Sequence, residues 1–174
     1  MREPATGERI RRFMSRLGRA VRGEARAYLV GGATAVLLGW RESTIDVDLK
    51  IVPERDDFFR ALPELKEELR LNVELASPDQ FIPPLPGWEE RSLSLGREGA
   101  VEWFHYDLYA QALAKIERGH ERDREDVRKM LALGLVEPSR LRELFVRIEP
   151  DLIRYPALDP RSFRAKLEEA LRKG

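Results

Sequence analysis

Two aspartates, Asp46 and Asp48, lie two positions apart in a run of alternating residues and could together bind divalent metal ions. Polar side chains occupy every second position from Thr44 to Lys50, and apolar side chains occupy the positions between them. In an extended strand, this alternation places the apolar side chains on one face and both carboxylates on the other, roughly 7 Å apart. Because carboxylates are hard oxygen ligands, the pair favours Mg²⁺ or Mn²⁺ over zinc.

A glycine pair, Gly31-Gly32, lies upstream and is suited to binding phosphate groups. It separates a short apolar run at 27–30, which predicts a buried strand, from another at 33–38, which predicts a helix. Residues without Cβ let phosphate oxygens approach backbone N–H groups closely. An isolated pair is more typical of an ordinary tight turn, so the argument depends on its distance from the aspartates. Thirteen residues separate Gly32 from Asp46, which leaves room for one short helix and a return to the next strand.

This arrangement resembles the minimal nucleotidyltransferase domain of the DNA polymerase beta superfamily. The shared pattern, within about residues 24–130, is a hydrophobic residue, a glycine pair, a spacer of this length, and then Asp, a hydrophobic residue and Asp. The glycine-pair variant is most similar to uncharacterised prokaryotic branches and to nucleotidyltransferase-type toxins of toxin-antitoxin pairs. The resemblance implies a nucleoside triphosphate (NTP) substrate, Mg²⁺ or Mn²⁺ held by Asp46 and Asp48, and phosphates cradled by Gly31 and Gly32.

One position departs from the family pattern. Members with serine directly after the first glycine have a hydroxyl for the phosphate, whereas Gly32 offers only its N–H. Ser43 or Thr44 could supply the hydroxyl and Arg41 a positive charge, since all three lie close to the metal strand in sequence. We therefore predict nucleotide-binding roles for these three residues. A surface ion pair with Glu42 or another acid is the alternative for Arg41.

The family also implies a third carboxylate on a neighbouring strand, and Glu74 is the prediction. After a predicted helix, apolar residues alternate again in the run 71–75, and Glu74 falls on its polar face. We predict that Glu74 completes the metal site and acts in catalysis. Glu102 and Asp107, in a later run, are the competitors. A solvated carboxylate on a strand face is the alternative for each.

The segment at 112–131 combines helical spacing of apolar residues with charged residues, and Gly119 interrupts it. We predict two helices or one kinked helix there. Its charged residues resemble the lysine, the Arg-Asp pair and the further Asp of the toxin-like relatives. In this chain they are Lys115, Arg122, Asp123 and Asp126. The resemblance implies that Lys115 reaches the nucleotide, and the alternative is a set of ion pairs on a wet helix face.

The order of elements predicts an α/β (α+β) fold, in which a nucleotidyltransferase-like mixed sheet with flanking helices precedes a helical C-terminal part. A chain of 174 residues is long enough for one domain with a sizeable core. We predict a single domain at 1–174, with its core at 24–109 and the helical part at 110–174 packed on that core. Helices are predicted at 55–69, 110–118, 122–133, 138–147 and 161–172, and a hairpin at 93–106.

Composition excludes several kinds of site and gives no prior for nucleic acid. Acidic and basic residues balance at 31 each, and the absence of cysteine excludes disulfides and thiolate metal sites. Two histidines, His105 and His120, are too few and too separated for a zinc centre, and we expect both to be structural or at the surface. Without a long apolar run or the apolar stretch of a signal peptide, we expect a cytoplasmic protein with no membrane contact.

The first 26 residues concentrate positive charge, with eight arginines against three glutamates. Five apolar residues of this segment form the stripe of an amphipathic helix: Ile10, Phe13, Met14, Leu17 and Val21. The basic face could meet RNA or an acidic partner. We favour pairing with acidic groups of the same domain.

Together these features predict a metal-dependent nucleotidyltransferase that moves a nucleoside monophosphate from NTP to an RNA, protein or small-molecule acceptor. The toxin-like resemblance adds a toxin-antitoxin system with a partner protein as a candidate setting. One alternative is a catalytically silent, antitoxin-like binding module, which the three carboxylates argue against and the missing hydroxyl at Gly32 argues for. A glycosyltransferase with Asp46-x-Asp48 on a sugar nucleotide is disfavoured by the short chain and the glycine turn.

Overall fold

A computed structural model describes the backbone of residues 1–173 and the side chains of residues 1–172. The chain divides into two compact units. The first consists of residues 1–77 and 92–106, and the second contains residues 78–91 together with the chain from Asp107 onward. The loop at 78–91, which the sequence prediction placed within the core, thus belongs to the helical unit.

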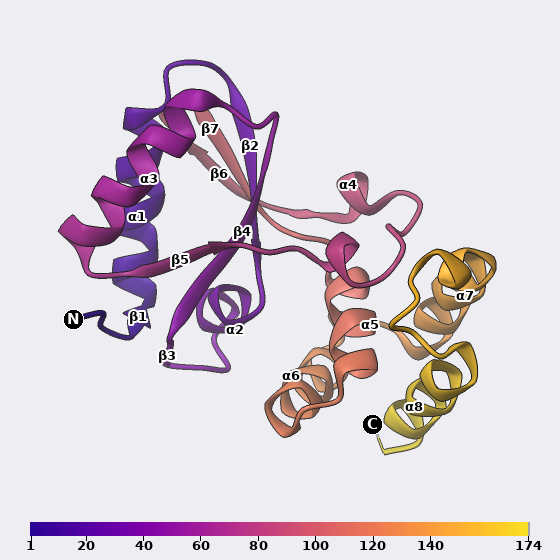
Figure 1. Ribbon diagram of the computed structural model, residues 1–174. Coiled ribbons are helices and arrows are strands. Elements are labelled where there is room, and N and C mark those ends of the chain that lie inside the picture. The colour runs from indigo at the N-terminus through magenta and orange to yellow at the C-terminus, as the bar shows by residue number, and fades with distance from the viewer. Residues whose placement is uncertain (174) are drawn as a thin grey trace. The chain divides into compact units, whose positions relative to one another are not determined.

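A mixed five-stranded sheet forms the centre of the first unit, as predicted, with the strand order β5-β4-β2-β7-β6 (Figure 1). Its strands are β2 (Ala25–Val30), β4 (Asp46–Val52), β5 (Asn72–Leu75), β6 (Leu93–Glu98) and β7 (Val101–His105). β4 runs antiparallel to β2 and parallel to β5, while β2 is parallel to β7. The predicted hairpin is confirmed, since β6 and β7 pair antiparallel across a tight turn.

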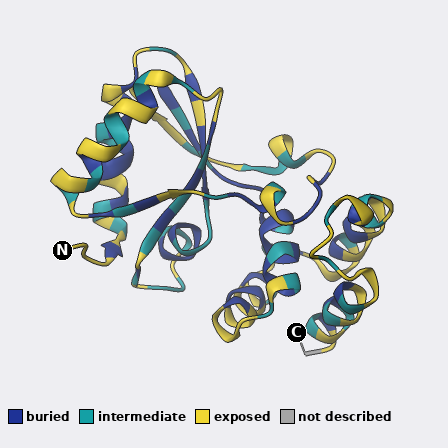
Figure 2. Cartoon of the chain, viewed as in Figure 1, coloured by how far each residue is buried: buried dark blue, intermediate teal, exposed yellow. Residues whose placement is uncertain are grey.

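Two helices, α1 (Gly7–Ala20) and α3 (Asp56–Leu69), lie side by side over one face of this sheet (Figure 1). The five residues of the predicted apolar stripe of α1 are all buried, and Phe13 meets Trp103 of β7 edge to face at 6.1 Å. Figure 2 shows buried residues in the central strands β2, β4 and β7 and along α1. The apolar side chains of β4 join this core, so the face of β4 that carries polar residues is directed to the other side of the sheet.

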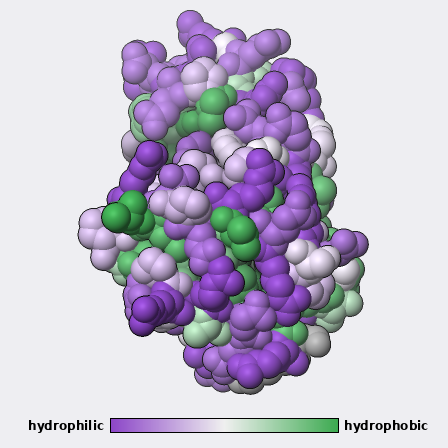
Figure 3. Space-filling model, turned by 90° about the vertical axis from the view of Figure 1, so that its right-hand side faces the viewer, coloured by the Kyte–Doolittle hydropathy of each residue, from purple (hydrophilic) through white to green (hydrophobic). Residues whose placement is uncertain are grey.

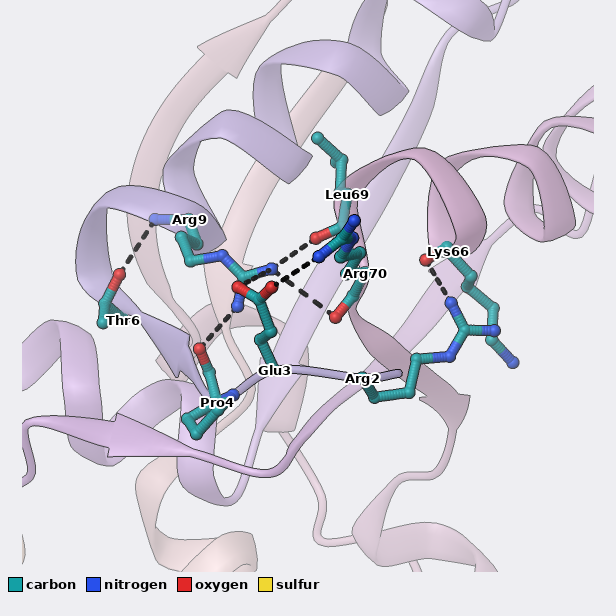
Figure 4. A network of polar contacts seen from close by, with 8 residues as sticks. All are labelled: Arg2, Glu3, Pro4, Thr6, Arg9, Lys66, Leu69 and Arg70. Atoms are coloured by element: carbon teal, nitrogen blue, oxygen red, sulfur yellow. Dashed lines mark hydrogen bonds and ion pairs between the residues drawn. The ribbon is translucent and has the colours of Figure 1, made fainter.

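The N-terminal segment is tied to the end of α3 by arginine side chains (Figure 4). Arg9 donates hydrogen bonds to the carbonyl oxygens of Pro4 and Leu69, and Arg2 donates to the carbonyl oxygen of Lys66. Farther along α1, Arg16 forms a bidentate ion pair with Glu68, with N–O distances of 2.6 and 2.7 Å. The interpretation that the basic face pairs with acidic groups of its own domain is confirmed for Arg16.

A short helix and a short strand pair lie between the glycine turn and β4. β1 (Ala5–Thr6) pairs antiparallel with β3 (Ser43–Thr44), directly before β4. α2 (Gly32–Leu38) begins at the glycine pair and ends at Gly39, whose φ of 100° is readily accessible to glycine. The chain thus returns from the turn to β4 within one short helix, as the spacing predicted.

The second unit is helical. Its elements are η1 (Pro78–Gln80), α4 (Trp88–Arg91), α5 (Leu108–Arg118), α6 (Glu121–Ala132), α7 (Pro138–Ile148), η2 (Glu149–Arg154) and α8 (Pro160–Lys173). α5 packs against α6, α7 and α8, and Phe145 meets Phe163 edge to face at 4.9 Å. All four helices predicted beyond residue 109 are present, and Gly119 separates the first two.

Glu137 holds the N-cap position of α7, because Pro138 already begins the helix. The large apolar side chains of this unit that are exposed are Phe81, Leu133, Val146 and Ile153. Figure 3 shows one face of the molecule as mostly hydrophilic with separate hydrophobic patches. Within residues 1–173, no helix has both the length and the apolar character needed to span a bilayer.

Candidate functional site

Strand β4 carries both aspartates on one face, as its alternation predicted. Val47 and Leu49 are fully buried in the core, whereas Asp46 and Asp48 are half-buried on the opposite side. Ile45 is an exception to the predicted pattern. It precedes the strand and is 65% exposed, so the apolar face begins only at Val47.

Glu74 lies directly beside Asp48. β5 runs parallel to β4 with a register that places Asn72 opposite Asp46 and Glu74 opposite Asp48. Because registered residues of adjacent strands point to the same side of a sheet, all four polar side chains share one face. Val73 is buried on the other face, whereas Leu75, predicted to point inward, is 38% exposed at the end of this edge strand.

Asn72 links two of the carboxylates and was not recognised in the sequence. Its side-chain amide donates hydrogen bonds to Oδ1 of Asp46 and, at 3.2 Å, to Oε1 of Glu74. The alternation that placed Glu74 on the polar face also places Asn72 there, two residues earlier, so the signal was present. The amide supplies a positive dipole end between two like charges, which stabilises their proximity.

The two competing carboxylates lie elsewhere. Glu102 is on β7, which β2 separates from β4, and it pairs with Arg97 at 2.8 Å. Asp107 belongs to the second unit, where it caps α5 through the N–H of Tyr109 and pairs with Arg91 at 2.7 Å. Of Glu74, Glu102 and Asp107, it is therefore Glu74 that lies on β5, the strand paired with the aspartate-bearing β4.

The glycine turn approaches the aspartates closely. Gly31 has a φ of 63° and a ψ of −125°, a conformation that residues with a side chain rarely adopt. A Cβ atom on Gly31 would lie 3.4 Å from Oδ2 of Asp48, so the turn lies close to that carboxylate. The structure thus brings together the turn and the polar face of β4.

Thr44 occupies the space beside the second glycine. A Cβ atom on Gly32 would lie 2.6 Å from Cβ of Thr44 and closer still to its hydroxyl, so no side chain fits at this position. The Thr44 hydroxyl donates a hydrogen bond of 3.1 Å to the carbonyl oxygen of Asp46. Ser43 is half-buried in the β1–β3 pair, and Arg41 is half-buried just after α2, with its N–H bonded to the carbonyl oxygen of Ala35.

A buried histidine anchors the helix that follows the turn. Nδ1 of His105 lies 3.0 Å from the hydroxyl of Thr34 in α2, and this hydroxyl also donates to the carbonyl oxygen of Leu29 at 3.3 Å. His105 is 1% exposed. Burial, followed by the charge of Arg11, lowers the pKa of His105 to about 4. The imidazole is consequently neutral at pH 7 and ties α2 to the sheet, which agrees with the structural role expected from the sequence.

Lys115 lies in the second unit, within a buried ionic cluster. Its ammonium is 2.7 Å from Asp126 and 3.6 Å from Asp123, and Arg118 holds Asp123 through two bonds of 2.6 and 2.7 Å. Burial raises the pKa of Asp123, but the hydrogen bond from Arg118 and the charge of Lys115 outweigh it and lower that pKa overall.

The interpretation of wet ion pairs was therefore wrong for the two aspartates, which are buried between α5 and α6. Arg122 is exposed, as that interpretation expected, but within the described residues no ion pair joins it to another side chain. The cluster joins the two helices across the break at Gly119, where the sequence pattern showed only charged residues at helical spacing.

The donor set on the sheet fits a divalent cation by its chemistry. Asp46, Asp48 and Glu74 supply carboxylate oxygens, which Mg²⁺ and Mn²⁺ prefer. Within the described residues, no three Asp, Glu or His side chains already converge on one point where a cation would lie. The amide of Asn72 occupies the space between two of the three carboxylates, and the same side chain also carries an oxygen that could face a cation.

A family model described as "Nucleotidyltransferase of unknown function (DUF6036)" matches residues 9–168. The match covers both the sheet with its glycine turn and most of the helical unit. Comparisons with curated proteins and with solved structures gave no match.

Proposed function

The chain belongs to this nucleotidyltransferase family, and we propose that it transfers a nucleoside monophosphate from an NTP to a hydroxyl group of an acceptor. The observation that supports this best is the shared polar face of β4 and β5, where Glu74 stands opposite Asp48. The closeness of Gly31 to the Asp48 carboxylate supports a phosphate-binding turn next to these acids. The acceptor that carries this hydroxyl is an RNA, a protein or a small molecule.

In the proposed reaction, the acceptor oxygen attacks the α-phosphorus of the NTP. The bond between that phosphorus and the bridging oxygen of the pyrophosphate breaks, and pyrophosphate leaves with the electron pair. Glu74, the most exposed of the three carboxylates, accepts the proton of the acceptor hydroxyl. When bound by Asp46, Asp48 and Glu74, Mg²⁺ or Mn²⁺ would neutralise charge on the triphosphate and lower the pKa of the acceptor hydroxyl.

The residues around the glycine turn would bind the triphosphate. Gly31 and Gly32 present backbone N–H groups without side chains in the way. Thr44 lies where a side chain on Gly32 would otherwise extend, so its hydroxyl is the candidate to replace the serine hydroxyl of other family patterns. Ser43 and Arg41 flank it in sequence as further candidates.

Lys115 would act on the departing pyrophosphate as a positive charge. Its side chain is 9% exposed and paired with Asp126, so this role requires the ion pair to be shared with or exchanged for phosphate. The glycine-pair motif also leads us to propose kinship with toxin-antitoxin nucleotidyltransferases, and hence an antitoxin partner protein.

The proposed activity is tested by incubating the pure chain with each α-labelled NTP, Mg²⁺ or Mn²⁺, and total RNA or cell lysate. We expect label to appear on one acceptor class from one preferred NTP, and an Asp46→Asn/Asp48→Asn variant to transfer none. Transfer by that double variant at the wild-type rate would contradict the assignment. A wild type that labels no acceptor while still binding Mg²⁺ and NTP would instead favour a silent binding module.

A further inference from the structure

A pocket of about 320 Å³ lies within the second unit among α5, α6 and α8. Its apolar lining includes Ile116, Val127 and Ala170, two of which are almost completely buried. Its polar lining is dominated by positive charge, with Arg118, Arg124, Arg128 and Lys166 against the single carboxylate of Glu169. We call this the basic pocket. Its volume is at the lower end of the range typical of small-molecule sites.

Two arginines of the basic pocket have no partner within the described part of the chain. Arg124 and Arg128 lie four residues apart on α6 and therefore on the same side of the helix. No hydrogen bond or ion pair joins either guanidinium to residues 1–172. Like charges at this spacing destabilise a helix by a few tenths of a kcal/mol, so an anion between them would relieve a repulsion.

The remaining cations are held in place by the protein. The ammonium of Lys166 donates a 2.8 Å hydrogen bond to the carbonyl oxygen of Glu117 at the end of α5. The guanidinium of Arg118 is fixed by Asp123, which Lys115 also contacts. The buried ionic cluster thus joins α5 to α6 at the corner that forms one wall of the basic pocket.

We propose that the basic pocket binds a small organic phosphate. Its phosphate group would accept hydrogen bonds from Arg124 and Arg128, because two guanidinium groups present several N–H donors in the geometry that phosphate oxygens accept. The apolar or aromatic portion of the ligand would lie against Ile116 and Val127. The site uses none of the residues assigned to NTP transfer and goes beyond that function.

Phenyl phosphate is the appropriate probe, because it joins a phosphate dianion to a ring of suitable size. Binding is measured by titration calorimetry on the full chain carrying Asp46→Asn/Asp48→Asn, in EDTA, so that metal-dependent binding on the sheet does not contribute. We expect phenyl phosphate to bind more tightly than inorganic phosphate and than benzoate. Equal affinities for phenyl phosphate, inorganic phosphate and benzoate would contradict a site that recognises both the phosphate and the apolar group.

The decisive variant is Arg124→Gln/Arg128→Gln, with Arg122→Gln/Lys129→Gln as the matched control on the same helix. All four side chains are exposed, but only the first two line the basic pocket. We expect the first variant to weaken phenyl phosphate binding at least tenfold and the control to change it less than twofold. Ala170→Glu, which adds a carboxylate to the lining without removing an arginine, should abolish binding.

Unchanged affinity in the Arg124→Gln/Arg128→Gln variant, or an equal loss in its control, would overturn the proposal. Absence of binding to the parent chain at millimolar phenyl phosphate would do so as well. Since metal is removed and both aspartates are replaced, these results do not depend on whether the chain transfers nucleotides.

Discussion

The buried His105 makes the stability of the first unit sensitive to mild acid. In the native protein the pKa of His105 is about 4, because burial, aided by Arg11, disfavours the imidazolium. In the unfolded chain the pKa returns to about 6.5. Between these two values the unfolded state binds one more proton than the native state, so the free energy of unfolding falls as the pH falls.

The size of this effect follows from the two pKa values. Each pH unit within the window is worth up to about 1.4 kcal/mol. Lowering the pH from 7 to 5 should thus reduce the free energy of unfolding by about 2 kcal/mol through His105 alone. The salt-bridged carboxylates contribute mainly below this range, since unperturbed Asp and Glu titrate near pH 4.

The assay is urea unfolding at pH 7 and pH 5, followed by tryptophan fluorescence, because Trp103 lies two residues from His105 in β7. The perturbation is His105→Asn, which keeps a donor or acceptor for Thr34 but does not titrate. It should remove most of the loss between pH 7 and pH 5. His120→Asn is the matched control, since His120 is the other histidine of the chain and is exposed.

The reasoning is refuted if His105→Asn retains the full pH dependence, or if His120→Asn removes it instead. In either case the imidazole at position 105 does not stay neutral between pH 5 and pH 7.

Three further substitutions test particular contacts. Asn72→Asp should lower the melting temperature in EDTA through carboxylate repulsion and increase the stabilisation given by Mg²⁺. An unchanged stabilisation by Mg²⁺ would show that residue 72 does not lie at the metal site. Gly32→Ala should cost roughly 1–3 kcal/mol of unfolding free energy because its Cβ meets Thr44, and adding Thr44→Gly should recover part of it. Lys115→Ala removes the ammonium that Asp126 and Asp123 contact in the buried cluster and should cost roughly 3–5 kcal/mol, whereas the exposed Lys129→Ala should change stability by less than about 0.5 kcal/mol. Similar melting temperatures for the two lysine variants would contradict the buried ionic cluster.

Periodicity was sufficient to predict the elements that position the candidate site. Alternation predicted the two faces of β4, and the same rule placed Glu74 on the polar face of β5. Helical spacing predicted the buried stripe of α1, since the apolar face of an amphipathic helix can be read from the local sequence.

Contacts between side chains distant in sequence were not predictable in this way. The space that excludes a side chain at Gly32 is occupied by Thr44, twelve positions later, and depends on how the chain returns from α2. The burial of Asp123 and Asp126 depends on the packing of α6 against α5, which turns an apparently wet charged face inward toward Lys115.

The same limit applies to the helical unit as a whole. The proline-rich loop at 78–91 belongs to it through packing that no local pattern specifies. The basic pocket likewise combines three helices, and its arginines look like ordinary surface charges in the sequence.

The central claim, that Asp46 and Asp48 bind metal for an NTP, is tested most directly by thermal unfolding with and without Mg²⁺ and NTP. At one hundred times the dissociation constant, the ligand should stabilise the wild type by about 2.7 kcal/mol and raise its melting temperature by several degrees, and EDTA should remove the shift. Asp46→Asn/Asp48→Asn should fold but show no Mg²⁺-dependent shift. An equal Mg²⁺-dependent shift in the wild type and the double variant would contradict the claim.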